Sequence, residues 1–281
     1  MLPGRGVGSS YLREAAGMTR PAGGGDAGTP MRALSPEQLI EALKLIDDAD
    51  SVELKLTVPD QDRRSAVAAL EMDPIDGQIR QVAFFDTPDL ALERHGVVVR
   101  ARRIQGKGGD SVVKLRPVVP SELPPKLRAA EGFNVEVDAM PGGFVCSGAL
   151  KAIADSVVAR EVFAGRRAVR KLFTKEQRDL LGEHAPDGLR LDDLSVLGPV
   201  TVLKLKFTPG EYGRRLVAEL WFYPDGSRIL ELSTKCLPRE TFEVVARTRA
   251  FLAGRGIDLD AEQQTKTKTA LEFFAKELAS A

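Results

Sequence analysis

Cysteine and histidine are scarce in this chain of 281 residues. Cys146 and Cys236 are the only cysteines, too few for a disulfide framework or a thiolate zinc site. His95 and His184 lie in turn-like contexts without the partner spacing of a metal site or a nucleophile triad, so exposed loops are expected for both. Two inert thiols suit a reducing compartment, and a cytoplasmic protein is the simplest expectation.

The chain also lacks net charge and long apolar runs. Forty basic residues balance forty acidic ones, so bulk charge gives no support for binding to nucleic acid or to an anionic membrane. No stretch approaches the ~20 apolar residues that cross a bilayer. The early glycines are not followed by Gly-Lys-Ser/Thr, which argues against a phosphate-binding loop. Neither nucleic acid nor a membrane is an expected partner, and any anion site should be local.

The first 33 residues differ in composition from the rest. They are rich in glycine and proline and show no apolar periodicity, which predicts a flexible tail over residues 1–33. Ser35 is well placed to cap a helix, with Pro36 at its first position. No domain linker is evident beyond this point, so residues 34–281 are predicted to form one domain.

Charged residues two positions apart recur in segments that otherwise read as aliphatic strands. Because successive side chains on a strand point to opposite faces, each pair lies on one face and the aliphatic residues lie on the other. The pairs are Glu53/Lys55, Arg100/Arg102, Lys114/Arg116, Glu136/Asp138 and Lys204/Lys206. Together with Glu231 they bring seven bases and four acids to the charged faces, so a net cationic surface is expected.

These charged faces have two possible destinations. An open sheet would turn them to solvent, whereas a closed sheet would turn them into a tunnel and pack the aliphatic faces outward under helices. The recurrence of Arg and Lys on widely separated strands favours closure, and charges inside a protein must be paired or neutralised by a ligand. We therefore predict an α+β fold with a single antiparallel β-barrel, peripheral helices and an oligoanionic ligand.

Apolar periodicity and turn signals predict the order of the elements. Helices are expected from Ser35, from Asp60 and from Thr174, and over residues 146–157, 238–256 and 261–278. Strands are expected near residues 52–58, 79–86, 96–103, 111–117, 133–138, 189–194, 200–207, 215–223 and 227–233. A Pro-Asp-Gly turn joins the last two strands into a hairpin.

Several short motifs follow one another in a distinctive order. Glu53 and Lys55 open the series, followed by AFFDT at 83–87, VVRARR at 98–103, VVKLRP at 112–117, NVEVD at 134–138, ILELS at 229–233 and QTKTKTAL at 264–271. Over roughly residues 52–271, this order resembles the CYTH superfamily of triphosphate tunnel metalloenzymes. That superfamily includes class IV adenylate cyclases, thiamine triphosphatases and inorganic triphosphatases.

The resemblance implies a role for each matching residue. The implied phosphate ligands are Lys55, Arg100, Arg102, Lys114, Arg116, Lys204, Lys206 and Lys266. Glu53, Glu219 and Glu231 would be the carboxylate ligands of a Mg²⁺ or Mn²⁺ ion, and Glu53 and Lys55 would take part in catalysis. Arginine offers phosphate a planar fork, lysine offers a compact charge, and hard cations prefer carboxylate and phosphate oxygens.

Two positions depart from the family pattern. Ser51 stands where the first glutamate of the opening motif is expected, and Ser233 where the final strand would carry a second one. A neutral hydroxyl cannot replace the charge of a carboxylate, so each change should weaken a metal site. The leading hypothesis is a metal-dependent triphosphatase acting on inorganic or organic triphosphate. The alternatives are a non-catalytic polyphosphate-binding module and a class IV-type adenylate cyclase.

Overall fold

Nine strands close into one barrel in the computed structural model, which describes residues 36–259, 263 and 266–280. The order around the barrel is β1-β5-β6-β4-β3-β2-β7-β8-β9, with β9 pairing back onto β1. The strands are β1 (Ser51–Val58), β2 (Gln78–Asp86), β3 (Val97–Ile104), β4 (Gly109–Leu115), β5 (Phe133–Met140), β6 (Gly143–Ala154), β7 (Ser195–Phe207), β8 (Leu216–Phe222) and β9 (Arg228–Cys236). The predicted antiparallel barrel is confirmed, and β1 and β5 add one parallel pairing to it.

Strand register places the charged pairs on the inner face of this barrel. Lys204 on β7 lies opposite Glu219 on β8, which lies opposite Glu231 on β9. Across the closing strands, Glu53 lies opposite both Lys235 and Asp138. Residues that are cross-strand partners project from the same face. The predicted arrangement, with charged side chains inside and aliphatic side chains outside, is therefore correct.

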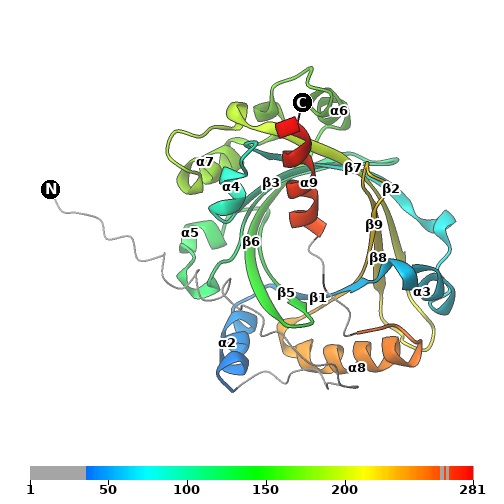
Figure 1. The fold of residues 1–281 in the computed structure, drawn as a ribbon. Coiled ribbons are helices and arrows are strands. Elements are labelled where there is room, and N and C mark those ends of the chain that lie inside the picture. Colours follow the sequence, from blue (N-terminus) through cyan, green and yellow to red (C-terminus); the bar gives the residue numbers. More distant parts are fainter. Residues whose placement is uncertain (1–35, 260–262, 264–265, 281) are drawn as a thin grey trace, which may run out of the picture. The chain divides into compact units, whose positions relative to one another are not determined.

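Helices cover the outer, aliphatic face (Figure 1). Around the barrel lie α2 (Pro36–Asp47), α3 (Arg63–Ala69), α4 (Ala91–Arg94), α5 (Pro125–Arg128), α6 (Ser156–Phe163), α7 (Lys175–His184) and α8 (Thr241–Gly254). Two apolar clusters join these helices to outward side chains of the strands, such as Val52 and Val99 in one and Leu56 and Leu232 in the other. Apolar burial under the helices thus stabilises the closed sheet from outside.

Helix α7 is fixed to the barrel by one buried glutamine. It begins at the predicted cap, where Thr174 and Gln177 form a capping box. The Gln177 side chain also accepts from the Ser111 hydroxyl at 2.9 Å and donates to the carbonyl oxygens of Ser111 and Leu150, each at 3.0 Å. Every polar atom of the buried amide has a hydrogen-bond partner, and these bonds offset the cost of removing the amide from water.

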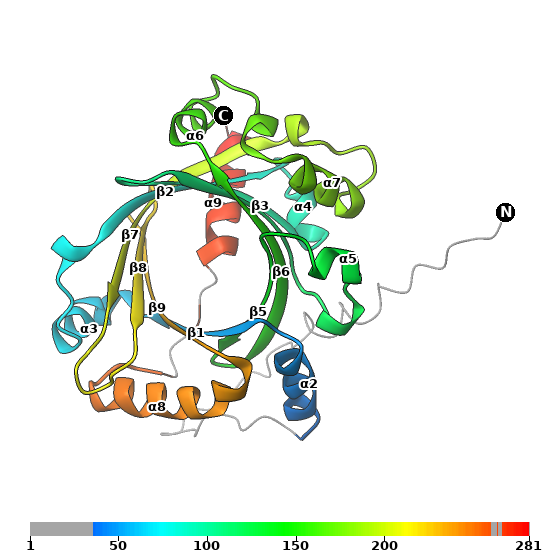
Figure 2. The ribbon, with the colours of Figure 1, turned by 180° about the vertical axis from the view of Figure 1, so that it is seen from behind.

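The last helix, α9 (Lys266–Ser280), packs against the inner face (Figures 1 and 2). Its side chains Ala270, Leu271 and Phe274 form an apolar cluster with residues that share the inner face of β2, β7, β8 and β9. Among these strand residues are Val82, Val202, Trp221 and Ile229. The interior therefore has an apolar part beneath α9 and a charged part along the remaining strands.

Two predicted elements are wrong. Residues 146–157 fit a helical spacing, but the chain is strand β6 as far as Ala154, and α6 begins only at Ser156. Strand β6 pairs with β4 on one side and β5 on the other, and a Cβ at Gly148 would lie 2.6 Å from the Phe133 ring. Ladder hydrogen bonds on both edges and close packing override the weak helical preference of this segment.

The strand predicted at residues 189–194 is a turn of 3-10 helix over Leu191–Asp193. The Asp193 carboxylate accepts the backbone N–H of Arg190 at 2.8 Å, a local hydrogen bond that favours a turn over a sheet ladder. Strand β7 begins at Ser195 instead. The predicted tail over residues 1–33 and the cap at Ser35 lie outside the described residues.

No helix among the described residues combines the length and the apolar character needed to cross a membrane.

Candidate functional site

The predicted phosphate ligands converge on the barrel interior from several strands. Lys55, Arg100, Arg102, Lys114 and Lys204 share the inner face. Arg116 follows the end of β4, Lys206 is exposed near the end of β7, and Lys266 is the first residue of α9. The side chains of Lys55, Lys114 and Lys204 remain 15%, 22% and 16% exposed. Water therefore reaches this part of the interior.

Asp138 on β5 is the centre of a cluster of cations. Its side chain is fully buried, with Lys55 Nζ 2.6 Å from Oδ1, Arg116 Nη1 2.9 Å from Oδ2 and Lys114 Nζ 4.0 Å from Oδ2. Burial alone would raise the pKa of this carboxyl, but the three cations lower it to about 2. Asp138 is therefore charged at neutral pH and holds Lys55 and Arg116 in place.

A second cluster surrounds Glu219 on β8. Lys204 Nζ lies 2.6 Å from Glu219 Oε1, and Lys266 Nζ forms ion pairs with Glu219 and, at 2.6 Å, with Glu231 Oε1. Lys266 Nζ also lies 5.3 Å from the centre of the Trp221 ring, a cation–π contact. Burial opposes the charge on Glu219, but Lys266 and Lys204 hold its pKa well below the usual range. The start of α9 is thus anchored to two carboxylates.

These two clusters define the paired side of the interior, formed by β5, β1, β9, β8 and the start of α9. Here the described cations Lys55, Lys235 and Lys266 each form an ion pair with an inner carboxylate. Lys55 shows the balance: burial would lower its pKa, yet Glu53 and Asp138 raise it above the usual value. On this side, charge is neutralised within the protein.

The opposite, cationic side consists of β4, β3 and β2. Arg80, Arg100, Arg102 and Lys114 face inward from these strands. Of these, Arg102 is held by Asp110, through Nε to Oδ1 at 2.8 Å and Nη2 to Oδ2 at 2.7 Å. Within the described residues, Arg100 and Arg80 make no ion pair, and the buried Nε atom of each has no hydrogen-bond partner. The cationic side is therefore short of carboxylates.

The burial of Arg100 and Lys114 shows in their pKa values. Burial, assisted by repulsion from Arg102, lowers the pKa of Arg100 to about 10. Burial also lowers the pKa of Lys114 to about 8, against the attraction of Asp138. A buried cation without a nearby counter-ion costs free energy that a bound anion would recover.

Three inner carboxylates are placed to hold a metal ion. Oxygens of Glu53, Glu136 and Asp138 lie within 4.8 Å of one another, and three carboxylates suit a hard divalent cation. The predicted set was Glu53, Glu219 and Glu231. The latter two lie opposite each other on β8 and β9, but Lys266 lies between them, while Glu53 belongs to the other group. The metal ligands named from sequence remain a prediction.

The two serines that depart from the family pattern contact these carboxylates. The Ser233 hydroxyl donates to Glu53 Oε1 at 3.0 Å, and the Ser51 hydroxyl lies 3.5 Å from Glu136 Oε2. Each serine thus donates to an acid instead of supplying one. Glu53 stays ionised, because Lys55 and Lys235 lower its pKa although burial opposes this.

Sequence reasoning missed four charged residues of the interior. Lys151, which lies opposite Val112 with its Nζ 3.6 Å from Asp110 Oδ2, falls in the segment predicted as a helix. Asp110, Arg80 and Lys235 each lack a charged neighbour two positions away, the feature by which the pairs were recognised. Asp110 is separated from Lys114 by Val112, and Lys235 from Glu231 by Ser233. In each case the inward side chains alternate along the strand, so extending the alternation to the strand ends would have found them.

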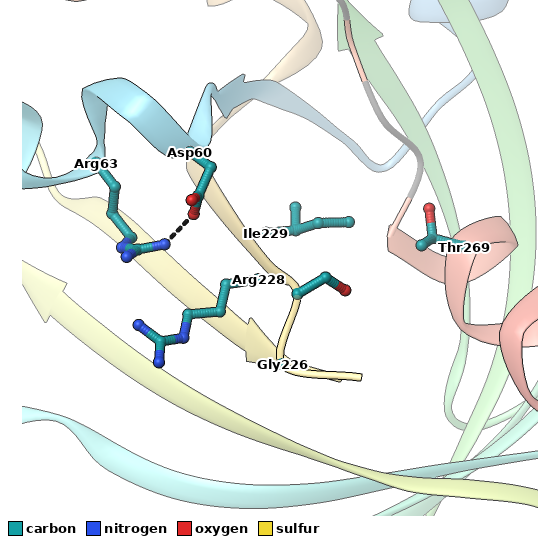
Figure 3. A pocket seen from close by; sticks show the side chains of 7 residues that line it. Asp60, Arg63, Gly226, Arg228, Ile229 and Thr269 are labelled. Carbon is teal, nitrogen blue, oxygen red and sulfur yellow. Dashed lines mark hydrogen bonds and ion pairs between the residues drawn. The ribbon is translucent and has the colours of Figure 1, made fainter. Parts of the chain in front are cut away.

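A cavity of about 400 Å³ lies near the start of β9 (Figure 3). It is lined by Asp60, Arg63, Gly226, Ser227, Arg228, Ile229 and Thr269. Arg63 is hydrogen-bonded to Asp60, and Ile229 and Thr269 come from β9 and α9. None of the predicted phosphate ligands lines this cavity.

Solved structures share this closed barrel. A protein from Hippeastrum, proposed as an adenylyl cyclase and described as having a dominant triphosphatase activity, is 16% identical, with a TM-score of 0.59 over 79% of this chain and 95% of its own. A protein from Bacillus halodurans, proposed as an adenylate cyclase, is 12% identical, with a TM-score of 0.54 over 78% and 98%. No protein-family model and no curated protein matches the sequence. The chain has the fold of the triphosphate tunnel, or CYTH, proteins.

Proposed function

We propose that this protein binds a triphosphate inside the barrel and hydrolyses it with the help of a divalent cation. The observation that carries this proposal is the shortage of carboxylates on the cationic side, where Arg100 and Lys114 are buried and poorly neutralised. An oligoanion would restore the balance of charge there. The Hippeastrum protein of the same fold is described as a triphosphatase, which supports this substrate class.

Each inner residue has a distinct task in this proposal. Arg100 and Lys114 bind phosphoryl oxygens, and their charge stabilises the negative charge that shifts during phosphoryl transfer. Arg102, held by both oxygens of Asp110, presents its remaining N–H groups in a fixed direction. Asp138 positions Lys55 and Arg116 through its ion pairs with them. Such pre-set cations lose little freedom when the substrate arrives.

The donor set fits a Mg²⁺ or Mn²⁺ ion. Glu53, Glu136 and Asp138 would hold it, since their oxygens converge and such ions take carboxylate oxygens together with substrate phosphate. When bound, the ion would polarise a phosphoryl oxygen. Lys55 pairs with Asp138 and Glu53, and Lys235 pairs with Glu136, so a bound ion would share these oxygens with the two lysines.

The decisive experiment measures phosphate release and binding side by side. Release from tripolyphosphate, thiamine triphosphate and ATP is followed with Mg²⁺, with Mn²⁺ and with a chelator, while calorimetry follows tripolyphosphate binding under each condition. Metal-dependent release is expected. Absence of release with either metal would exclude the triphosphatase, and formation of cyclic AMP from ATP would identify a cyclase instead.

A second candidate function is a non-catalytic polyphosphate-binding module. It is favoured by Ser51 and Ser233, which replace expected acids, and by Lys266, which bridges Glu219 and Glu231. Glu53→Gln separates the two candidates, because an enzyme would lose turnover whereas a metal-free binder would gain affinity from the lost negative charge. Glu243→Gln, on the exposed surface of α8 beside Arg247, is the matched control and should change neither quantity.

A further inference from the structure

Arg80 is an inward-facing cation that belongs to none of the charged pairs visible in the sequence. It lies on β2, opposite Ile104 on β3 and Val202 on β7. Its inner-face neighbours are Arg102, which lies opposite Val82, and Lys204, which lies opposite Gln78. A third cation between two others is electrostatically unfavourable unless an anion joins them.

The guanidinium of Arg80 is held in place without being neutralised. Its Nη2 donates to Gln78 Oε1 at 3.0 Å, and the Gln78 amide in turn donates to the carbonyl oxygen of Gln105 at 3.3 Å. The buried Nε atom has no hydrogen-bond partner. Of the charged groups around it, Arg102 and Lys204 repel it, and Glu219 and Asp110 attract it. Both of these acids already form ion pairs, with Lys204 and Arg102 respectively.

Arg80 also lies at one end of a series of cations. Along β3, Val98 lies opposite Lys114 and Ile104 lies opposite Arg80, with Arg100 and Arg102 between these positions. Six residues of strand separate the two ends, or about 20 Å at ~3.3 Å per residue. A row of cations of this length suits an extended anion that has more than one charged group.

We infer that Arg80, together with Arg102 and Lys204, forms an additional anion subsite at the β2 end of the cationic side. The ligand class is a linear polyphosphate chain whose inner phosphoryl groups contact Arg100 and Lys114 and whose far group reaches Arg80. This inference rests on the proposed phosphate-binding function and adds chain-length preference to it. Gln78 is a positioning residue, because it fixes the fork of Arg80 towards the interior.

Arg103 supplies a matched control on the neighbouring strand. It also bonds a glutamine, Gln81, and also has a buried Nε atom without a partner. It follows Arg102 directly, so its side chain points to the outer face. Replacing Arg80 or Arg103 therefore removes the same chemical group from opposite faces of one sheet.

The test is calorimetric binding of pyrophosphate, tripolyphosphate and a longer linear polyphosphate, in the presence of chelator, by wild type and by Arg80→Gln, Arg80→Lys and Arg103→Gln. The Arg80→Gln loss is expected to grow with chain length and to reach about tenfold or more with the longest probe, the usual effect of one charge-assisted contact. Arg80→Lys should lose less, because it keeps the charge but not the fork. Arg103→Gln should bind like wild type.

The outcomes are distinguishable. If wild type binds none of the probes, the proposed function fails and the subsite fails with it. If wild type binds but Arg80→Gln stays within twofold of it with every probe, only the subsite is wrong. Equal losses in Arg80→Gln and Arg103→Gln, or a loss independent of chain length, would also overturn it. Thermal unfolding of each variant identifies any that fail to fold. If Arg80→Gln does not fold, Arg80→Lys is compared with wild type and with Arg103→Gln in its place.

Discussion

The two sides of the barrel interior use the same kinds of residue in different proportions. On the paired side, Lys55, Lys235 and Lys266 each contact a carboxylate. On the cationic side, Arg80, Arg100 and Lys114 are partly buried; the two arginines form no ion pair among the described residues, and Lys114 Nζ lies 4.0 Å from Asp138. On the paired side the inner cations are neutralised by carboxylates of the protein, whereas on the cationic side two of the arginines are not.

This difference separates stability from binding. A buried ion pair is costly to break, because its remaining member is left charged and unpaired. A buried cation without a partner already destabilises the folded protein by its desolvation. Removing it therefore does not lower the free energy of unfolding, but it does remove a contact with the ligand. Substitutions on the paired side should therefore act on the free energy of unfolding, and those on the cationic side on anion affinity.

The largest expected effect concerns Asp138. Asp138→Asn leaves Lys55 and Arg116 without their shared carboxylate in a fully buried position, which should lower the free energy of unfolding by about 3–5 kcal/mol. Urea denaturation measures it. Asp179→Asn, which breaks an exposed pair with Lys175, should change it far less, because water already screens an exposed pair. Equal losses in the two variants would contradict the central role of Asp138.

Arg100→Ala and Lys114→Ala should affect binding next most strongly. Each removes a charge-assisted contact worth about 1.5–3 kcal/mol, or roughly ten- to hundredfold in tripolyphosphate affinity. Their unfolding free energies should stay close to wild type, because neither cation is well compensated in the free protein. Calorimetry and denaturation on the same samples test both halves. A large loss of stability with unchanged affinity would reverse the assignment of the two sides.

The pH dependence of binding sharpens the role of Lys114. Its pKa in the free protein is about 8, lowered mainly by burial. Phosphate binds the protonated form, so above pH 8 binding must take up a proton, and affinity should fall by up to about tenfold per pH unit. Calorimetry between pH 7 and pH 9 measures the slope. Lys114→Arg should remove this component and leave only the slope due to the ligand itself, so identical slopes would rule out Lys114.

Lys206→Ala should have the smallest effect. Lys206 was predicted as a phosphate ligand, but its side chain is exposed near the end of β7. Exposed charges interact through water and contribute about 0–1 kcal/mol. Tripolyphosphate affinity should fall less than about fivefold, and most of that loss should vanish at high salt. A salt-independent loss as large as that of Arg100→Ala would place Lys206 inside the site.

The strands were predictable because alternation is a local property. Glu53/Lys55 and Arg100/Arg102 fix the inner face of β1 and β3 without reference to any other strand. Strand β6 was missed because its small residues, such as Gly148 and Ala149, read as helical until their pairing with β4 and β5 is known. Its conformation is set by neighbours distant in the sequence.

The site was predictable in its members but not in its pairings. Lys55 and Lys114 were identified from sequence pattern and family resemblance. Only the folded structure shows that Asp138 lies beside both, with Oδ1 2.6 Å from Lys55 Nζ and Oδ2 4.0 Å from Lys114 Nζ. The shortage of carboxylates around Arg100 is likewise a property of the assembled barrel. Register between strands depends on tertiary structure, so the division into a paired and a cationic side is not written in any single segment.

The pairing of β1 with β9, which closes the barrel, joins two strands that are synthesised at very different times. Cys236 lies opposite Val52 in this pairing, 184 positions later in the chain. During synthesis, strand β1 emerges long before β9, and α9, which covers the apolar inner residues, emerges after β9. Long-range pairing is slow and leaves strand edges exposed. The nascent chain therefore carries two open sheet edges until β9 has emerged, and its dependence on chaperones should fall once β9 pairs with β1.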